Sequence, residues 1–214
     1  MNSHPVANST CNSSPGKRDR TRLALVEAAI EILADKGLEG TSIDELMRVA
    51  GMARGTFYNY FESRDALACA ASDHIRARLY DSVVDRIPAD YTPEETFTCI
   101  TLGFIHYSLQ RPKTGWALVR IGGSSHWVTG DRFSRTRQAL CDILPAQVPP
   151  FMGLVFIEGI ALMVLRRLLE GVINTDEADT VIQLALHGVG IDAEKIPALL
   201  AKAKTFVATL DLPA

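Results

Sequence analysis

The sequence predicts an all-α protein, with an N-terminal three-helix unit followed by a larger set of helices. Apolar residues recur every three or four positions along most of the chain, which is the period of an amphipathic helix. Capping residues, glycines and prolines stand where these periods begin and end. No alternation of period two is sustained over several segments, so we expect no β-sheet.

The first two helices are predicted from their apolar stripes and their ends. The first covers residues 20–36 and is stopped by Gly37. The second opens at Ser42, with Glu45 at capping-box spacing, so that the hydroxyl and the carboxylate each accept a hydrogen bond from a backbone N–H. The inward-facing residues are Leu23, Val26, Ile30 and Leu33 in the first helix and Ile43, Leu46, Met47 and Ala50 in the second.

A tight turn and a third helix follow. Gly51 supplies the positive φ that the turn needs, and a short helix over residues 54–61 then crosses the second helix. Phe57 and Phe61 are four positions apart, so both can face inward and anchor the third helix. The residues left wholly or partly free to face outward are Arg54, Gly55, Thr56, Tyr58 and Asn59.

The rest of the chain also divides into helices. A long helix begins near Ser63 and ends before Pro88. Thr92, a proline at the first helical position and Glu95 form a strong start for the next helix. Further helices are predicted after residue 112 and over residues 131–144, 151–170, 176–189 and 194–210.

The charge of the chain limits how it can bind nucleic acid. The formal net charge is -3, and residues 17–67 carry eight Lys and Arg against nine Asp and Glu. Binding that ignores sequence depends on neutralising many phosphates. The composition therefore argues against a protein that coats nucleic acid, and any contact with DNA must be local.

No segment resembles a secretory signal or a membrane span. Residues 1–16 are rich in Asn, Ser and Pro without an apolar stretch, and we predict a disordered tail there. The longest apolar run, residues 151–165, is interrupted by Glu158 and is shorter than the ~20 residues of a membrane helix. We therefore expect a cytoplasmic protein without a membrane partner.

The cysteines predict neither a metal site nor a disulfide framework. Cys11, Cys69, Cys99 and Cys141 are scattered, without a C-x-x-C pair or a histidine at metal spacing. We expect reduced thiols, and a redox-sensing role for one of them stays open. No acid–base pair or nucleophile triad stands out, so no catalytic site and no cofactor are expected.

Several residues at fixed offsets form one recognisable pattern. Ala50-Gly51 makes the turn between two helices, residues 55–61 read G-T-F-Y-N-Y-F, and Arg64 and Leu67 follow. Over residues 18–78 this frame resembles the helix-turn-helix region of the tetracycline-repressor family.

The resemblance implies two domains. Residues 17–65 would form a homeodomain-like, helix-turn-helix DNA-binding domain, and residues 66–214 a helical domain for effector binding and dimerisation. The sequence departs from the family pattern at Ile43, Met47 and Ala53. The missing hydroxyl at Ala53 leaves a backbone donor of the third helix without a cap, at a cost of ~1 kcal/mol.

The outward residues of the third helix suit a DNA groove. Gly55 and Thr56 are small enough for close approach to the major groove. Arg54 can donate a fork of hydrogen bonds to a guanine edge, or bind a phosphate. Tyr58 and Asn59 are expected at base edges or thymine methyl groups. A purely structural aromatic core is the alternative for Tyr58, as it is for Tyr60.

Other contacts are implied by the resemblance. Tyr60 and Arg64 would contact phosphates, with hydroxyl or backbone donors from Ser42 and Thr41. Residues 17–22 carry a net charge of +3 and either follow a phosphate backbone or form a solvated helix start. The predicted DNA-binding residues are Thr41, Ser42, Arg54, Gly55, Thr56, Tyr58, Asn59, Tyr60 and Arg64.

In the C-terminal half, the resemblance extends only to the general plan. Helices 151–170 and 176–189 are the candidates for a homodimer interface, with an internal core as the alternative. A ligand pocket is expected among the middle helices, with His106, Arg120, His126 and Glu158 as possible polar groups. Its predicted lining is Phe97, Phe104, Tyr107, Trp116, Trp127 and Phe156, with Phe133 and Met152 as further candidates.

These features together predict a homodimeric repressor of double-stranded operator DNA. A small-molecule effector would lower its DNA affinity through the helix over residues 63–87. An activator or a multidrug sensor of the same fold is the alternative, and a helical small-molecule enzyme is a rival that no catalytic motif supports. Neither the effector nor the operator sequence is predicted.

Overall fold

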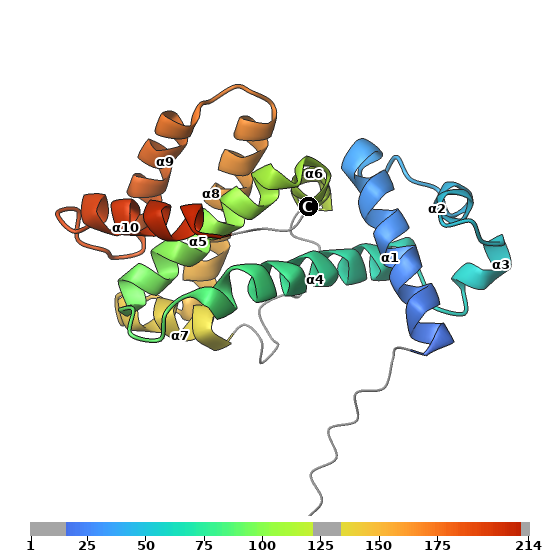
Figure 1. Cartoon of the computed structure of the whole chain (residues 1–214), viewed down its shortest axis with the longest axis horizontal. Coiled ribbons are helices and arrows are strands. Elements are labelled where there is room, and N and C mark those ends of the chain that lie inside the picture. The colour runs from blue at the N-terminus through green and yellow to red at the C-terminus, as the bar shows by residue number, and fades with distance from the viewer. Residues whose placement is uncertain (1–15, 122–133, 211–214) are drawn as a thin grey trace, which may run out of the picture.

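The computed structural model describes residues 16–121 and 134–210, and within these ranges every regular element is a helix. The predicted all-α fold class is therefore confirmed. Figure 1 shows an elongated molecule with a small helical unit at one end, residues 17–61, which we call the head. The long helix α4 connects the head to the remaining helices. The elements are α1 (Lys17–Lys36), α2 (Ile43–Val49), α3 (Arg54–Phe57), α4 (Arg64–Ser82), the 3-10 turn η1 (Val84–Arg86), α5 (Pro93–Gln110), α6 (Pro112–Ile121), α7 (Ser134–Ile143), α8 (Pro150–Leu169), α9 (Thr175–Gly188) and α10 (Ile196–Ala208).

Two helices are shorter than predicted. The third helix ends at Phe57 instead of near Phe61, and residues 58–60 form turns. The long helix α4 ends at Ser82 and is followed by η1. Because Ala53 makes no side-chain hydrogen bond at the start of α3, this single helical turn depends on packing rather than on its own cap.

The two predicted capping boxes have different outcomes. The Thr92 hydroxyl accepts from the N–H of Glu95 at 3.2 Å, and the Glu95 carboxylate accepts from the N–H of Thr92 at 2.9 Å, so this box is confirmed. At α2 only half of the box forms, with Ser42 accepting from the N–H of Glu45. The Glu45 carboxylate lies 2.6 Å from Lys36 Nζ instead, because a full positive charge is a stronger partner than a backbone N–H.

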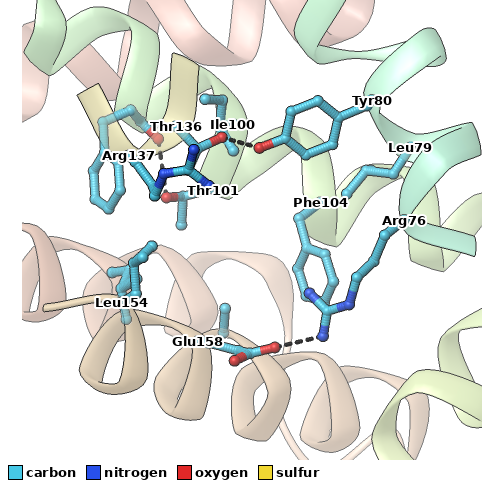
Figure 2. Close-up of a pocket in the computed structure, with 13 residues that line it drawn as sticks. Arg76, Leu79, Tyr80, Ile100, Thr101, Phe104, Thr136, Arg137, Leu154 and Glu158 are labelled. Atoms are coloured by element: carbon cyan, nitrogen blue, oxygen red, sulfur yellow. Dashed lines mark hydrogen bonds and ion pairs between the residues drawn. The ribbon is translucent and has the colours of Figure 1, made fainter. Parts of the chain in front are cut away.

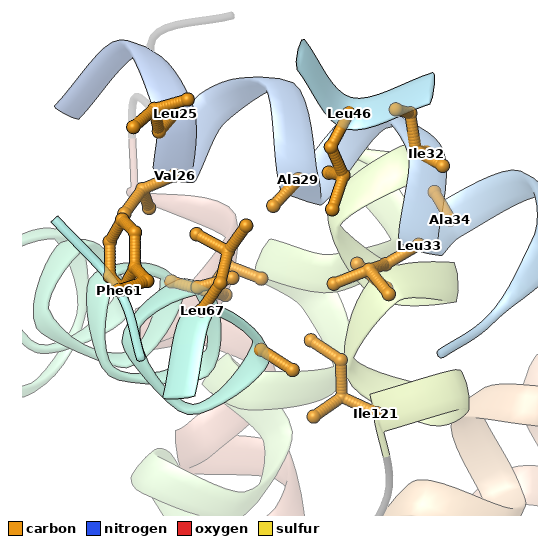
Figure 3. Packing of buried hydrophobic residues seen from close by; sticks show 14 of the residues in the cluster. Leu25, Val26, Ala29, Ile32, Leu33, Ala34, Leu46, Phe61, Leu67 and Ile121 are labelled. Atoms are coloured by element: carbon orange, nitrogen blue, oxygen red, sulfur yellow. The ribbon is translucent and has the colours of Figure 1, made fainter. Parts of the chain in front are cut away.

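One apolar core holds the head to the rest of the molecule. Side chains from one face of α1, including Leu25, Ala29 and Leu33, point into it (Figure 3). Leu23 is predicted to face inward but is 41% exposed, so that prediction is wrong: the apolar face of α1 begins at Leu25. The predicted boundary between the two domains lies at residues 65 and 66, and this core contains residues from both sides of it. The division into two domains stays a prediction. Its buried members outside α1 are Leu46, Met47, Phe57, Phe61, Leu67, Ala68, Ala71, Ile75, Ala117, Leu118 and Ile121.

Helix α6 makes polar contacts with α1 as well as apolar ones. Lys113 forms an ion pair with Glu31, and the Arg120 guanidinium donates to the backbone carbonyl of Ala34. Arg120 also lies over the ring of Trp116, at 4.8 Å from its centroid. The head is therefore held by α6 as well as by α4, a connection that the sequence did not predict.

Helix α5 supports two apolar clusters among the remaining helices. Phe97 and Ile105 pack with residues of α7, α8 and α9. Ile100 and Tyr107 pack with residues of α10 and of the end of α4. Different sides of one helix thus serve two cores, which places α5 at the centre of this half of the molecule. Across residues 16–121 and 134–210, no helix has both the length and the apolarity that a membrane crossing requires.

The turn at Gly51 gives a test of the head. Gly51 has φ of 66°, as predicted, and an added Cβ would meet no atom within 4 Å. We expect Gly51→Ala to lower the free energy of unfolding by about 1 kcal/mol, because the left-handed backbone is unfavourable for alanine. Gly51→Asn should cost less, since asparagine tolerates this conformation. Urea unfolding followed by circular dichroism measures both values.

Gly55 provides the matched control. Its φ is not positive, and an added Cβ would again meet nothing within 4 Å. Gly55→Ala should be as stable as the wild-type protein or more so, because alanine is the better helix former. Equal stability of Gly51→Ala and the wild-type protein would mean that the turn does not require the left-handed conformation.

Candidate DNA interface and ligand cavity

The outer surface of the head brings most of the predicted DNA-binding residues together. They are carried by α3, the turns after it, and the start of α2. Ser42, Arg54, Gly55, Tyr58 and Asn59 are exposed, and Thr56 and Tyr60 are half-buried.

The aromatic residues of this segment divide between the core and the surface. Phe57 and Phe61 are 0% and 4% exposed, so both are the inward anchors that the sequence predicts. Tyr58 is 59% exposed, with its ring edge-on to Phe57 at 5.3 Å between centroids. Tyr60 is half-buried against the head core. The alternative of a purely structural core is therefore wrong for Tyr58.

Arg54 has an acidic neighbour on α2. Its Nη1 lies 3.0 Å from Asp44 Oδ2, and each side chain is 64% exposed. An ion pair this exposed contributes little to stability. The guanidinium is therefore orientated on the surface of the head but can exchange its partner at little cost.

Thr41 and Arg64 have structural contacts that the sequence did not predict. Thr41 is 2% exposed, its hydroxyl donates to the carbonyl of Gly37, and its N–H donates to Leu38. The prediction that Thr41 supplies a donor to DNA is therefore wrong, because both of its donors are used within the protein. Arg64 Nη1 donates to the carbonyls of Leu38 and Thr41, which joins the start of α4 to the loop before α2. The predicted contact of Arg64 with a phosphate stays a prediction, and the other nitrogens of the guanidinium would have to make it.

The basic residues near the N-terminus are part of α1 and lie beside the turns that follow α3. Lys17 and Arg18 line a surface depression together with Asn59 and Tyr60. Arg22 lies over the ring of Phe61, at 5.0 Å from its centroid. The first turns of α1 therefore extend the exposed surface of α3 with positive charge.

A cavity of about 90 Å³ lies between α4, α5, α7 and α8. One water molecule needs roughly 10–15 Å³, so there is room for a small organic molecule. The walls are mainly aliphatic and aromatic (Figure 2). The lining residues are Arg76, Leu79, Tyr80, Phe97, Ile100, Thr101, Phe104, Thr136, Arg137, Leu154, Ile157, Glu158 and Ala161.

Two polar pairs interrupt the apolar wall. Arg76 Nη2 lies 2.6 Å from Glu158 Oε1, with side chains only 11% and 16% exposed. The Tyr80 hydroxyl forms a hydrogen bond with Thr136, and Figure 2 shows this pair on a different side of the cavity from Arg76 and Glu158. Burial raises the pKa of the Glu158 carboxyl, and the positive charge of Arg76 opposes that rise. Burial also raises the pKa of Tyr80.

Only part of the predicted pocket lies at this cavity. Phe97 and Phe104 line it, while Tyr107 is buried elsewhere, under the guanidinium of Arg111. Trp116 packs against the head core, and Phe156 is 44% exposed on the outside of α8. Tyr107, Trp116 and Phe156 therefore do not line this cavity, and their contact with a ligand stays a prediction.

Of the further residues predicted for the pocket, some line the cavity and others lie elsewhere. Glu158 lines the cavity, whereas Met152 is 61% exposed and Arg120 contacts α1. His106 lies in a separate surface groove between α5, α9 and α10. Trp127, His126 and Phe133 lie outside the described residues.

Sequence reasoning missed the polar residues of α4 and α7. Arg76 and Tyr80 are four positions apart and therefore lie on one face of α4. That spacing, beside the buried residues Ile75 and Leu79, is a signal that α4 lines a site as well as connecting two parts of the molecule. For Glu158, the interruption of a long apolar run is the corresponding signal.

Helices α8 and α9 expose apolar side chains on their outer surfaces. An added Cβ at Gly188 of α9 would meet the ring of Phe156 of α8 at 2.9 Å, so the two helices approach closely there. The exposed apolar residues are Phe151, Met152, Val155, Phe156 and Met163 on α8 and Val181 and Leu184 on α9.

One cysteine is excluded as a redox sensor. Cys99 is 1% exposed, and burial raises its pKa to about 12. The thiolate is the reactive form of cysteine, so this thiol is inert at neutral pH.

Comparisons with known proteins match the helices of the head. Residues 25–71 match the family model of bacterial regulatory proteins of the tetR family. YvdT of Bacillus subtilis, an uncharacterized HTH-type transcriptional regulator, is 38% identical over 66 residues, which cover 31% of this chain and 34% of YvdT. The HTH-type transcriptional regulator BetI of Rhizobium meliloti is 30% identical over 79 residues, 37% of this chain and 39% of BetI. The chain thus spans less than half the length of these curated relatives.

Solved structures extend the similarity to the remaining helices. The crystal structure of RolR in complex with resorcinol has a TM-score of 0.59 and 22% identity, and the match covers 92% of this chain and 97% of RolR. A putative TetR-family transcriptional regulator from Rhodococcus sp. has a TM-score of 0.62 and 19% identity, over 79% of this chain and 98% of that protein. At these identities the structures show a shared fold. Residues 25–71 therefore match the tetR family of bacterial regulatory proteins in sequence, and the chain as a whole shares its fold with solved structures of TetR-family regulators.

Proposed function

We propose that the protein is a transcriptional repressor that binds a near-palindromic operator as a homodimer and is released by a small ligand. The observation that carries this proposal is the group of exposed side chains from Arg54 to Asn59, held in place by the buried ring of Phe57. The relatives that match this segment are named as HTH-type transcriptional regulators.

The surface of the head supports major-groove binding. Nothing lies within 4 Å of a Cβ added at Gly55, so the backbone of α3 can approach base edges closely. Arg54 can exchange Asp44 for a guanine edge, because the pair between them is exposed. Lys17 and Arg18 would add phosphate contacts beside Asn59.

The exposed apolar surface of α8 and α9 supports a homodimer. Monomeric proteins seldom expose large apolar patches, and such surfaces mark interaction sites. A two-fold interface there would pair the same helices of both copies. The two recognition helices would then enter successive major grooves, roughly 34 Å apart.

The position of the cavity supports control by a ligand. Its walls include α4, which leads to the head, and α8, which carries the apolar surface. RolR, a protein of the same fold, was crystallised with resorcinol, a small aromatic molecule. A ligand that favours one arrangement of α4 and α8 would change the separation of the two heads and so lower DNA affinity. Because α6 also holds α1, we propose that both helices transmit the change.

An activator or a multidrug sensor of the same fold remains the alternative. Footprinting of the DNA beside the gene, combined with transcription assays with and without ligands, separates these functions. Repression relieved by a ligand supports the proposal, and ligand-dependent activation contradicts it.

Arg54→Ala tests base recognition. We expect operator affinity to fall by roughly 10- to 100-fold, with relaxed preference at one base pair, because a bidentate contact to a guanine is worth about 1–3 kcal/mol. Binding to operator variants is measured by fluorescence anisotropy.

Lys195→Ala is the control for a lost surface cation. Lys195 forms an exposed ion pair with Glu94 near α10, at the far end of the molecule from the head (Figure 1). Its removal should leave operator binding unchanged. Unaltered affinity and specificity in Arg54→Ala would remove this residue from the interface.

Leu184→Lys tests the dimer. Leu184 is 69% exposed, so a lysine there should leave the fold of one copy intact while placing a charge in the proposed interface. We expect the wild-type protein to sediment as a dimer and the variant as a monomer at micromolar concentration. Leu23→Lys, at a leucine of α1 that is 41% exposed, should remain dimeric. A wild-type protein that sediments as a monomer at all concentrations would contradict the proposed interface.

A further inference from the structure

The buried ion pair of the cavity connects two helices that have different positions in the molecule. Arg76 belongs to α4, which leads to the head, and Glu158 belongs to α8, which carries the exposed apolar surface. Arg76 is also fixed by its Nε, which donates to the Ser72 hydroxyl at 3.2 Å. Two charges removed from water are stable only together, so this pair is the part of the cavity most sensitive to a charged ligand.

The two partners respond differently when they are separated. A guanidinium keeps its charge at any accessible pH, so Arg76 requires an anion wherever it is buried. A carboxyl group can bind a proton and remain buried as a neutral acid. Burial already raises the pKa of Glu158, and loss of the Arg76 charge would raise it further. An exchange of partners is therefore favourable only when an incoming anion takes Arg76 and Glu158 becomes neutral.

We propose that the cavity binds a small, mainly apolar monocarboxylic acid, whose carboxylate replaces that of Glu158 on Arg76. The apolar body of the ligand would lie against Phe97, Leu154 and Ile157, which line the same space. A volume of about 90 Å³ restricts this body to a single ring or a short alkyl chain. The regulatory consequence rests on the proposed function, whereas the binding itself does not.

The exchange conserves charge and protons. The ligand enters as the neutral acid, its O–H proton passes to the Glu158 carboxylate, and the ligand carboxylate pairs with the Arg76 guanidinium. The cavity holds one ion pair and one neutral carboxyl group after the exchange, so its net charge is unchanged. A cationic ligand would instead compete with Arg76 for the Glu158 carboxylate, and a neutral ligand would leave the original pair in place.

The exchange also breaks the tie between α4 and α8. Glu158, once protonated, no longer attracts Arg76 by charge, and the ligand carboxylate is not attached to either helix. In the proposed repressor, this loss lets α4 change its position relative to α8 and so alters the separation of the two heads.

The proposal predicts a pH dependence. The other charged or titratable groups that line the cavity with Glu158 are Arg76 and Tyr80 from α4 and Arg137 from α7. The lining residues of α5 carry no titratable group, and α6 and α9 contribute none to the cavity wall. At neutral pH the free ligand is an anion, so binding takes up about one proton from solution. Affinity should therefore rise as the pH falls, by up to about tenfold per pH unit.

Calorimetry with three matched probes tests the charge of the ligand. Benzoate, benzyl alcohol and benzylammonium share one ring and differ in charge. Titration of the full-length protein at neutral pH should show benzoate binding at least about tenfold more tightly than the other two, because only benzoate can form a charged hydrogen bond with Arg76. Repeating the titration in two buffers of different ionisation enthalpy should show an uptake of about one proton.

Two substitutions in the pair assign the roles. Arg76→Gln should weaken benzoate binding by roughly 10- to 100-fold. Glu158→Gln should retain benzoate binding but abolish the proton uptake, because glutamine cannot accept the proton. Arg166→Gln and Glu170→Gln are matched controls on the exposed ion pair of α8, 2.9 Å apart, and should change neither quantity. Circular dichroism confirms that each variant is folded.

Several results would overturn the proposal. These are equal binding of benzylammonium or benzyl alcohol, proton uptake that persists in Glu158→Gln, and absence of binding by benzoate, phenylacetate and hexanoate alike. Operator binding is measured separately with and without benzoate. Carboxylate binding that leaves operator affinity unchanged supports the ligand assignment and contradicts release by this ligand, whereas operator binding without carboxylate binding overturns the ligand assignment alone.

Discussion

The arrangement of the whole molecule depends on the burial of one face of α1. Helices α2 and α3 are too short to be stable alone, and they persist because Leu46 and Phe57 pack into the core beneath α1. The same core contains residues of α4 and α6. The recognition surface is therefore positioned by helices whose other ends belong to the rest of the protein. For this reason a structural change in the rest of the protein can reach the head.

Two arginine–carboxylate ion pairs of this protein consist of the same chemical groups but differ in burial, and burial changes what each pair can do. Arg54 and Asp44 are exposed, so water screens their attraction and a DNA group can replace the carboxylate. Arg76 and Glu158 are largely removed from water, so neither can lose its partner without a replacement or a proton. The exposed pair suits recognition of an external anion, and the buried pair suits a switch between two internal states.

Local features of the fold were predictable because they depend on neighbours in the chain. The positive φ of Gly51, the inward anchors Phe57 and Phe61, and the capping box of Thr92 and Glu95 all follow from spacings of a few residues. The second half of the box at Ser42 failed because Lys36, from another helix, competes for the Glu45 carboxylate. Arg64 likewise donates to the carbonyls of Leu38 and Thr41, 26 and 23 residues away, a contact that no local spacing specifies.

The sequence alone determined the helical class, the order of the helices and the residues that can be offered to DNA, because the helical period shows which side of each helix is apolar. It did not determine which other helix covers that side. Tyr107 and Phe156 are as aromatic as Phe97, yet only the tertiary packing directs Phe97 into the cavity. The pair of Arg76 and Glu158, whose members are 82 residues apart, exists only because α4 and α8 meet there. Burial energy depends on area rather than on partner, so the identity of the partner is decided by the packing of the whole chain.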